Sequence, residues 1–166
     1  MRTKLLSLFA ASLLLAACET TPTTTAGSGG GGAAAAAAPA AAPRTGPVPG
    51  SQQDLVVNVG DRVFFNLDKS DLTPEARRTL ERQAAWLKQY GNVAVTIEGH
   101  CDERGTREYN LALGDRRAKA ASNYLASLGI AASRIRTISY GKERPAVLGS
   151  NEAAWSQNRR GVTVVN

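Results

Sequence analysis

The stretch Glu98-Gly-His-Cys-Asp-Glu-Arg-Gly-Thr-Arg-Glu-Tyr-Asn-Leu-Ala-Leu-Gly-Asp-Arg-Arg-Ala118 decides the fold of this chain. Just before it, valine and isoleucine occupy every second position from 93 to 97, which is typical of a half-buried strand. After its loop of charges and glycines, the apolar residues recur with the period of a helix, which we predict over 106–128. The charged loop therefore joins a strand to a helix, a position where binding sites are often built.

One face of this predicted helix is apolar along most of its length but begins with two polar side chains. At 3.6 residues per turn, the face consists of Asn110, Leu113, Arg117, Ala121, Tyr124 and Leu128, whereas Arg116 points elsewhere. A guanidinium stays charged and is costly to desolvate, so an inward Arg117 needs a partner unless it snorkels past the edge of the core. The residue pattern leaves two partners open, namely Asp102 or the carboxylate of a ligand.

The other elements of the segment 54–166 follow from the same kinds of pattern. We predict a first strand region with Val57, Val59, Val63 and Phe65, interrupted by Gly60-Asp61. A helix begins at Thr73-Pro74-Glu75, ends near Gly91 and buries a stripe of Ala76, Leu80, Ala84 and Leu87. A strand over 134–140, a short helix over 151–158 and a strand over 161–165 complete the chain. Strands that alternate with helices predict a two-layer α/β domain, with helices packed on a mixed sheet.

The first residues have the features of a lipoprotein signal. Arg2 and Lys4 precede an apolar run over 5–17, which is typical of a secretory signal and shorter than the roughly 20 residues of a transmembrane helix. The run ends in Leu15-Ala-Ala-Cys18, which resembles the lipobox of bacterial lipoproteins. We therefore expect a signal peptide over 1–17 and acylation of Cys18, the alternative being an ordinary signal with an incidental cysteine. Glu19, in place of an aspartate, favours the outer membrane.

The segment 18–53 is predicted to be a lipidated cysteine followed by a disordered tether. From Thr20 to about Gln53 it consists mostly of Thr, Pro, Gly and Ala, a composition that buries almost no apolar surface. About 35 such residues span roughly 30 to 35 Å as a flexible coil and on the order of 115 Å when fully extended. The tether would let the domain at 54–166 reach away from a membrane surface.

Charge and cysteine usage narrow the classes of function. The formal net charge is +6, but basic residues are interleaved with acidic ones and no aromatic platform accompanies them, which makes nucleic acid a poor ligand. Cys101 is the only cysteine besides Cys18, so acylation of Cys18 would leave no internal disulfide. His100 and Cys101 are neighbours on an extended strand and point to opposite faces. We therefore expect no shared metal, no cofactor and no catalytic cysteine–histidine pair.

The segment 99–118 resembles the peptidoglycan-binding motif of OmpA-like domains. The later stretches Ser139-Tyr-Gly-Lys-Glu-Arg-Pro-Ala-Val-Leu148 and Asn151-Glu-Ala-Ala-Trp-Ser-Gln-Asn-Arg-Arg160 resemble the peptidoglycan-associated lipoprotein (Pal) family of Gram-negative bacteria. The resemblance covers roughly 56–166. It implies a lipid-anchored, non-enzymatic outer-membrane protein that binds peptidoglycan noncovalently. It also implies the Tol system, with TolB as a partner, and a role in envelope integrity and in outer-membrane constriction during division.

The same resemblance implies which residues bind the wall. Asp102 and Arg117 match the family's acid and arginine, which would recognise the ammonium and the carboxylate at the side-chain end of meso-diaminopimelate. The other positions that match are Asp68, Asn110 and the packing residue Leu113. Asp68 has a plain alternative as a turn residue or helix-entry acid.

Three further positions carry expectations. Gly99 and Gly105 are expected to let the backbone approach the ligand. Cys101 departs from the family, in which alanine or threonine is more frequent, so it puts in doubt any contribution of a threonine hydroxyl there.

Two other functions stay open at this point. One is that of an OmpA-like lipoprotein outside the Tol system, and the other is that of a wall hydrolase. Binding to TolB would distinguish the first, and release of soluble muropeptides would reveal the second.

Overall fold

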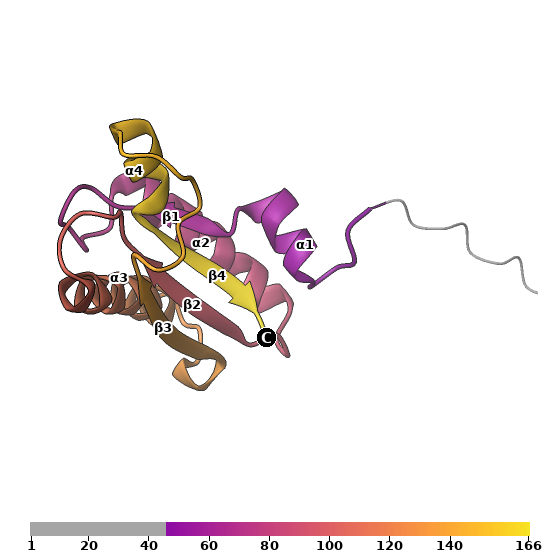
Figure 1. Ribbon diagram of the computed structural model, residues 1–166. Helices are drawn as coiled ribbons and strands as arrows, with labels where there is room; N and C mark the ends of the chain where they lie inside the picture. Colours follow the sequence, from indigo (N-terminus) through magenta and orange to yellow (C-terminus); the bar gives the residue numbers. More distant parts are fainter. Residues whose placement is uncertain (1–45) are drawn as a thin grey trace, which may run out of the picture. The chain divides into compact units, whose positions relative to one another are not determined.

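The computed structural model describes residues 46–166, so the predicted signal peptide, Cys18 and most of the predicted tether lie outside the described residues. In chain order the elements are α1 (Gln52–Asp54), the π-helical turn η1 (Leu55–Val59), β1 (Arg62–Phe64), α2 (Pro74–Gln89), β2 (Val95–His100), α3 (Arg107–Ser127), the 3-10 turn η2 (Ala132–Arg134), β3 (Ile135–Gly141), α4 (Glu152–Asn158) and β4 (Arg160–Val165) (Figure 1). Within residues 46–166, no helix is both long enough and apolar enough to cross a membrane.

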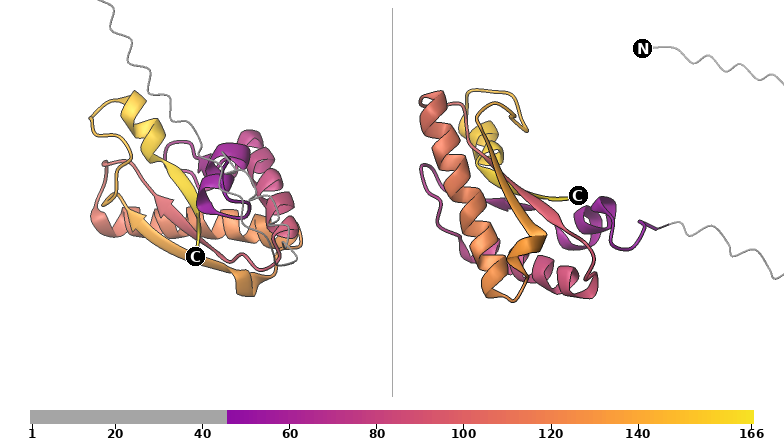
Figure 2. Two further views of the ribbon diagram at one scale, coloured as in Figure 1. Left: turned by 90° about the vertical axis from the view of Figure 1, so that its right-hand side faces the viewer. Right: turned by 90° about the horizontal axis from the view of Figure 1, so that it is seen from below.

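The four strands form one mixed sheet in the order β1-β4-β2-β3. β2 and β3 are parallel, whereas β4 runs antiparallel to both β1 and β2. α3 packs against β2 and β3, and α2 packs beside it against α3 and β1, so that these two helices form one layer on the sheet; α4 leads into the start of β4 (Figure 2). This arrangement confirms the predicted two-layer α/β fold.

Helix α2 begins and buries its side chains as the sequence predicts. The Thr73 hydroxyl accepts a hydrogen bond from the Ala76 amide at 3.1 Å, and Pro74 occupies the first helical position. The predicted stripe is buried in the core. Gln83 is buried among these apolar residues as well, because its side chain bonds to the Gly60 carbonyl at 2.7 Å and to the Thr163 hydroxyl at 2.9 Å.

The prediction of the first strand is wrong for its first half, which forms a helical turn in the structure. Val57 and Val59 belong to the π-helical turn, which ends at Gly60 with a φ of 96°, and only Arg62–Phe64 form β1. The valine alternation does not mark a buried face, since Val57 is 62% exposed and only Leu55 of this turn is buried. The hydrogen bond from the Gly60 amide to the Leu55 carbonyl, at 2.8 Å, closes the turn instead.

Residues just before position 54, which the sequence assigns to the tether, contact the sheet and α2. The Gln52 side chain accepts a hydrogen bond from the Val165 amide at 2.7 Å and donates to the Thr163 carbonyl at 3.3 Å. Asp54 accepts hydrogen bonds from the Gly50 amide and the Trp86 indole, each at 2.9 Å. These bonds hold the pKa of Asp54 below its ordinary value.

Close contact between β2 and α3 fixes the loop that joins them. A Cβ atom on Gly99 would lie 1.8 Å from the Gly114 carbonyl oxygen, so only glycine fits there. The expectation that Gly99 makes room for a ligand is therefore wrong, because its missing side chain makes room for the helix.

Candidate functional site

A cavity of about 340 Å³ lies where the segment after β1, the β2–α3 loop and the first turns of α3 meet. Its lining includes all five side chains that the sequence selects, namely Asp68, Asp102, Asn110, Leu113 and Arg117. The other lining residues are Leu67, Cys101, Arg104, Gly105 and Tyr109. Gly105 has a φ of +85°, a backbone conformation that favours glycine. The structure thus brings together residues that are up to 50 positions apart.

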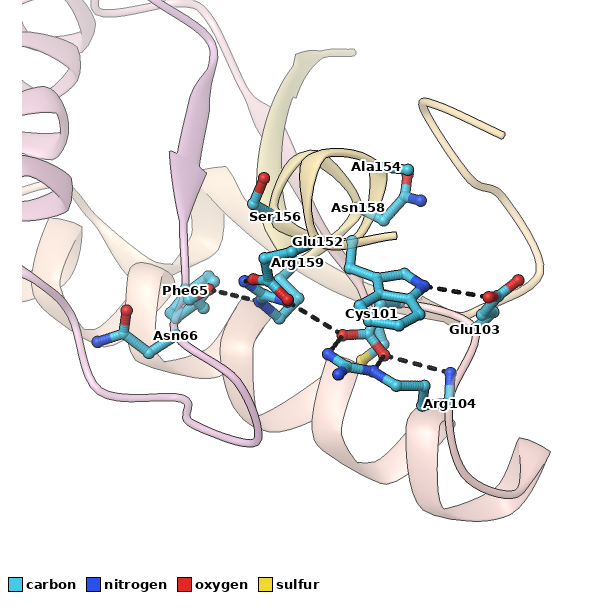
Figure 3. Close-up of polar contacts among 12 residues, drawn as sticks. Phe65, Asn66, Cys101, Glu103, Arg104, Glu152, Ala154, Ser156, Asn158 and Arg159 are labelled. Carbon is cyan, nitrogen blue, oxygen red and sulfur yellow. Dashed lines mark hydrogen bonds and ion pairs between the residues drawn. The ribbon is translucent and has the colours of Figure 1, made fainter. Parts of the chain in front are cut away.

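Asp102 is the buried acid of the cavity, with 5% of its surface exposed. Its Oδ2 lies 2.6 Å from Arg104 Nη2 and 3.3 Å from Arg159 Nη1, and its Oδ1 accepts from the Arg104 amide and Nε, each at 3.2 Å (Figure 3). Burial raises the pKa of Asp102, but the hydrogen bonds from the two arginines outweigh it and hold the pKa below its ordinary value. The carboxylate is therefore ionised at neutral pH.

The two arginines that contact Asp102 are held very differently. Arg159, whose side chain is 7% exposed, also donates to the Phe65 carbonyl at 3.2 Å and pairs with Glu152. The Arg104 side chain is 35% exposed and stacks over the Trp155 ring at 4.0 Å. Arg159 is thus part of the packed structure, whereas Arg104 lies at the cavity edge.

Arg117 is fully buried, and Asp102 is not its partner. Its Nε donates to the Lys69 carbonyl at 2.9 Å, Nη1 to the His100 carbonyl at 2.8 Å and Nη2 to the Asn66 carbonyl at 3.1 Å. Three carbonyls from two segments, the loop after β1 and the end of β2, thus take the place of the carboxylate that the residue pattern left open as a partner. Burial lowers the pKa of Arg117, yet an arginine stays protonated at neutral pH.

Carbonyl oxygens carry only partial charge, so the positive charge of Arg117 is hydrogen-bonded but not neutralised. Within residues 46–166 no carboxylate lies within ion-pair distance of it. Among the same residues, one of its two Nη2 hydrogens has no acceptor. The cavity is therefore bordered by a buried cation that can still bind an anion.

Asn110 and Cys101 connect Arg117 to the loop. The Asn110 amide donates to the Arg104 and Thr106 carbonyls, at 2.7 and 2.9 Å, which fixes the turn that leads into α3. The Cys101 thiol donates to the Asn110 carbonyl and accepts from Arg117 Nη1, both at 3.3 Å. Burial raises the pKa of Cys101, so the thiol is neutral at neutral pH and serves as a packing and hydrogen-bonding group.

Asp68 places a second acid at the exposed rim of the cavity. Its φ of 57° is unusual for a residue other than glycine, which agrees with the turn interpretation. The Tyr109 hydroxyl donates a hydrogen bond to its carboxylate across the rim. The turn thus presents the Asp68 side chain to the cavity.

His100 does not line the cavity, whereas Cys101 does. The His100 ring is 2% exposed, lies against Tyr140 with ring centroids 5.6 Å apart, and has Nε2 3.3 Å from Glu98. Burial and the nearby positive charge of Arg160 lower the pKa of His100 to about 4, so it is neutral at neutral pH. Among residues 46–166 there is no group of three or more side chains placed to hold a metal ion.

Besides Leu67, four residues of the site were not identified from the sequence. Arg104 and Tyr109 lie inside the motif at 99–118, close in sequence to the predicted site residues Asp102 and Asn110, and this closeness could have indicated that they belong to the site. Arg159 and Trp155 reach the β2–α3 loop from positions more than 50 residues further along the chain. No local pattern predicts these two contacts, because they depend on how α4 packs.

Comparison with known proteins defines the class. The family model of the OmpA family matches residues 64–159, which include the stretches 99–118 and 139–148, all but the last residue of 151–160, and the whole cavity. The crystal structure of the C-terminal domain of Helicobacter pylori MotB has a TM-score of 0.60 at 18% identity and covers 64% of this chain and 84% of that one, a similarity that shows the fold alone. The chain belongs to the OmpA family.

Within this family, the chain belongs with the peptidoglycan-associated lipoproteins. A protein of that name from Agrobacterium fabrum is 61% identical over 117 residues, which are 70% of this chain and 66% of the relative. The relative from Pseudomonas aeruginosa is 49% identical over 117 residues, 70% of this chain and 69% of its own length. The crystal structure of the peptidoglycan-associated lipoprotein from Burkholderia pseudomallei has a TM-score of 0.62 at 40% identity and covers 64% of this chain and 90% of that one.

Proposed function

We propose that this chain is an outer-membrane lipoprotein, anchored through Cys18, that binds peptidoglycan noncovalently. The ligand is the diaminopimelate of the stem peptide, and the result is a tether between outer membrane and wall that works as part of the Tol system. The names of the relatives support the general part of this proposal, since they are called peptidoglycan-associated lipoproteins.

The observation that carries the proposal is the paired chemistry of the cavity. An ionised carboxylate, Asp102, and an unneutralised guanidinium, Arg117, border the same 340 Å³ space. The side-chain end of meso-diaminopimelate carries an ammonium and a carboxylate on one carbon. Charged groups of both signs in one small cavity fit such a zwitterion, because each ligand charge meets its opposite.

The roles of the remaining residues follow from their contacts. Arg117 is the group for the ligand carboxylate, because it is a cation whose protein contacts are neutral carbonyls and a thiol. Asn110 keeps the loop in shape, and Leu113 forms apolar lining. Asp68 is placed at the rim, where it can meet a second polar group of the stem.

Sedimentation with isolated sacculi tests the proposal. The full-length chain in detergent should pellet with sacculi that contain diaminopimelate, and it should release no soluble muropeptides. A chain that stays in the supernatant would contradict wall binding, and release of muropeptides would support a hydrolase instead.

Membership of the Tol system needs its own test. Purified TolB should capture the chain, and soluble stem peptide should weaken this capture if wall and TolB compete for overlapping surfaces. Failure of TolB to bind would leave a wall-binding lipoprotein outside the Tol system.

A further inference from the structure

The ion pair between Arg104 and Asp102 fills the part of the cavity that the proposed ligand ammonium would need. Two Arg104 nitrogens and its amide donate to the Asp102 carboxylate, the shortest contact being 2.6 Å. An ammonium carries the same charge and also binds through N–H donors. A ligand ammonium and the Arg104 guanidinium would therefore compete for the same oxygens.

Of the two arginines on Asp102, Arg104 is the one that can move. Arg159 is 7% exposed and has two further partners, the Phe65 carbonyl and Glu152, so its displacement would break several contacts. Among the described residues, Arg104 has Asp102 as its only ion-pair partner, and its side chain is 35% exposed. A ligand that approaches from solvent meets Arg104 first.

Trp155 provides a place for Arg104 after it leaves Asp102. The Arg104 guanidinium lies 4.0 Å from the centre of the Trp155 ring, a cation–π contact that does not involve Asp102 (Figure 3). The ring is itself held, because its Nε1 donates to Glu103 Oε1 at 3.1 Å. A small rotation of the Arg104 side chain can break the ion pair while the guanidinium stays on the indole.

We propose, on the basis of the proposed function, that Arg104 is an internal substitute for the ligand ammonium. In the empty cavity it neutralises Asp102, and when diaminopimelate binds, the ligand ammonium takes its place while Arg104 remains on Trp155. Arg104 thereby sets the affinity, since binding must break one ion pair to form another. It also favours ligands that carry a positive charge. A neutral ligand group that displaced Arg104 would leave the negative charge of Asp102 with one cation fewer than in the free protein.

Calorimetry with a meso-diaminopimelate stem tripeptide tests this exchange. We expect Arg104→Gln to bind on the order of three- to tenfold more tightly than the unchanged full-length chain, because the competing ion pair is gone. The matched control is Arg107→Gln, which removes the same charge three positions away, where the side chain is 72% exposed and pairs with Glu143 instead of Asp102. Its affinity should stay within about twofold of the unchanged chain, which separates ion-pair exchange from a general charge effect.

The two proposals fail in different ways. If the unchanged chain does not bind the tripeptide, the proposed function is wrong and this inference is wrong with it. If the unchanged chain binds, but Arg104→Gln binds equally or more weakly, Arg104 is no competitor and only the inference is overturned.

A second measurement uses the unchanged chain alone, so it tests the exchange even if Arg104→Gln folds poorly. In the unchanged chain, the side-chain Nε–H resonance of Arg104 should shift on saturation with the tripeptide, whereas that of Arg159 should stay in place. An Arg104 resonance that is unaffected by bound tripeptide would overturn the exchange.

Discussion

Two arginines line the cavity and a third, Arg159, contacts its lining residue Asp102, and their surroundings give the three different properties. Arg117 is buried on carbonyl groups, Arg159 is buried in a network with two acids, and Arg104 is half-buried at the edge. The helical period predicts the inward direction of Arg117, because that direction is a local property of one helix. It cannot predict the carbonyl partners of Arg117 or the position of Arg159, since both depend on segments distant in sequence.

His100, on the other side of the sheet, makes a pH prediction possible. Burial, with the nearby charge of Arg160, lowers its pKa from 6.5 to about 4. Between these two pH values the unfolded chain binds a proton that the folded chain does not. The free energy of unfolding should therefore decrease as the pH falls from 6.5 to 4, by up to about 3 kcal/mol from this group.

This prediction can be checked in two ways. His100 is the only histidine, so a single imidazole signal should titrate near pH 4 in an NMR experiment on the folded chain. Urea unfolding should show a smaller loss of stability over this pH range for His100→Gln than for the unchanged chain. A His100 signal that titrates near pH 6.5 would show that the ring is solvated.

At the scale of whole elements, the sequence predicts best where local signals decide the structure. The caps and periods of α2 and α3 are local, and both helices occur where predicted. The predicted strand at Val57 and Val59 was wrong because local hydrogen bonds to Ser51 and Leu55 favour a helical turn over the weak valine alternation. The contact of β2 with α3 could not be predicted, because an isolated glycine does not reveal which backbone approaches it.

That contact predicts a large effect from a single methyl group. Gly99→Ala would place its Cβ against the Gly114 carbonyl, so strand and helix must separate. We expect a loss of stability of about 3 kcal/mol or more, at or beyond the upper end for overpacking. The control is Gly91→Ala, where no atom lies within 4 Å of the added Cβ.

Urea unfolding of the two variants measures this effect. The Gly91→Ala variant should stay within about 0.5 kcal/mol of the unchanged chain, as is usual for surface changes. Equal stabilities of the two variants would show that β2 and α3 are not in close contact.

At the scale of the whole molecule, the proposed function needs an anchor, a spacer and a binding domain. Replacing the thiol in Cys18→Ser should abolish acylation, because the thiol is the expected acceptor of the lipid. The variant should then leave the membrane fraction or remain unprocessed. Firm retention of Cys18→Ser in isolated outer membranes, with the wall digested, would contradict the lipoprotein anchor.

The spacer is expected to contribute reach and no binding contacts. Replacing residues 20–44 with a Gly/Ser sequence of equal length should leave the affinity for sacculi unchanged within about twofold, because both sequences are expected to behave as flexible coils. Sedimentation across a range of sacculus concentrations measures this affinity. A large loss would show that the native segment takes part in recognition.

The central claim is that the cavity recognises both charges of diaminopimelate, with Arg117 as the group for the carboxylate. A stem peptide with lysine keeps the ammonium and lacks that carboxylate. Without its anion, Arg117 would remain an uncompensated buried cation in the complex, which costs roughly 1 to 3 kcal/mol. The unchanged chain should therefore bind the lysine peptide roughly five- to 150-fold more weakly than the diaminopimelate peptide.

Isothermal titration of the two peptides against the unchanged chain, Arg117→Ala and the exposed control Arg116→Ala tests this claim most directly. We predict that Arg117→Ala binds both peptides weakly and discriminates little between them, whereas Arg116→Ala behaves like the unchanged chain. Equal affinity of the unchanged chain for the two peptides, or a larger effect at Arg116 than at Arg117, would contradict the account.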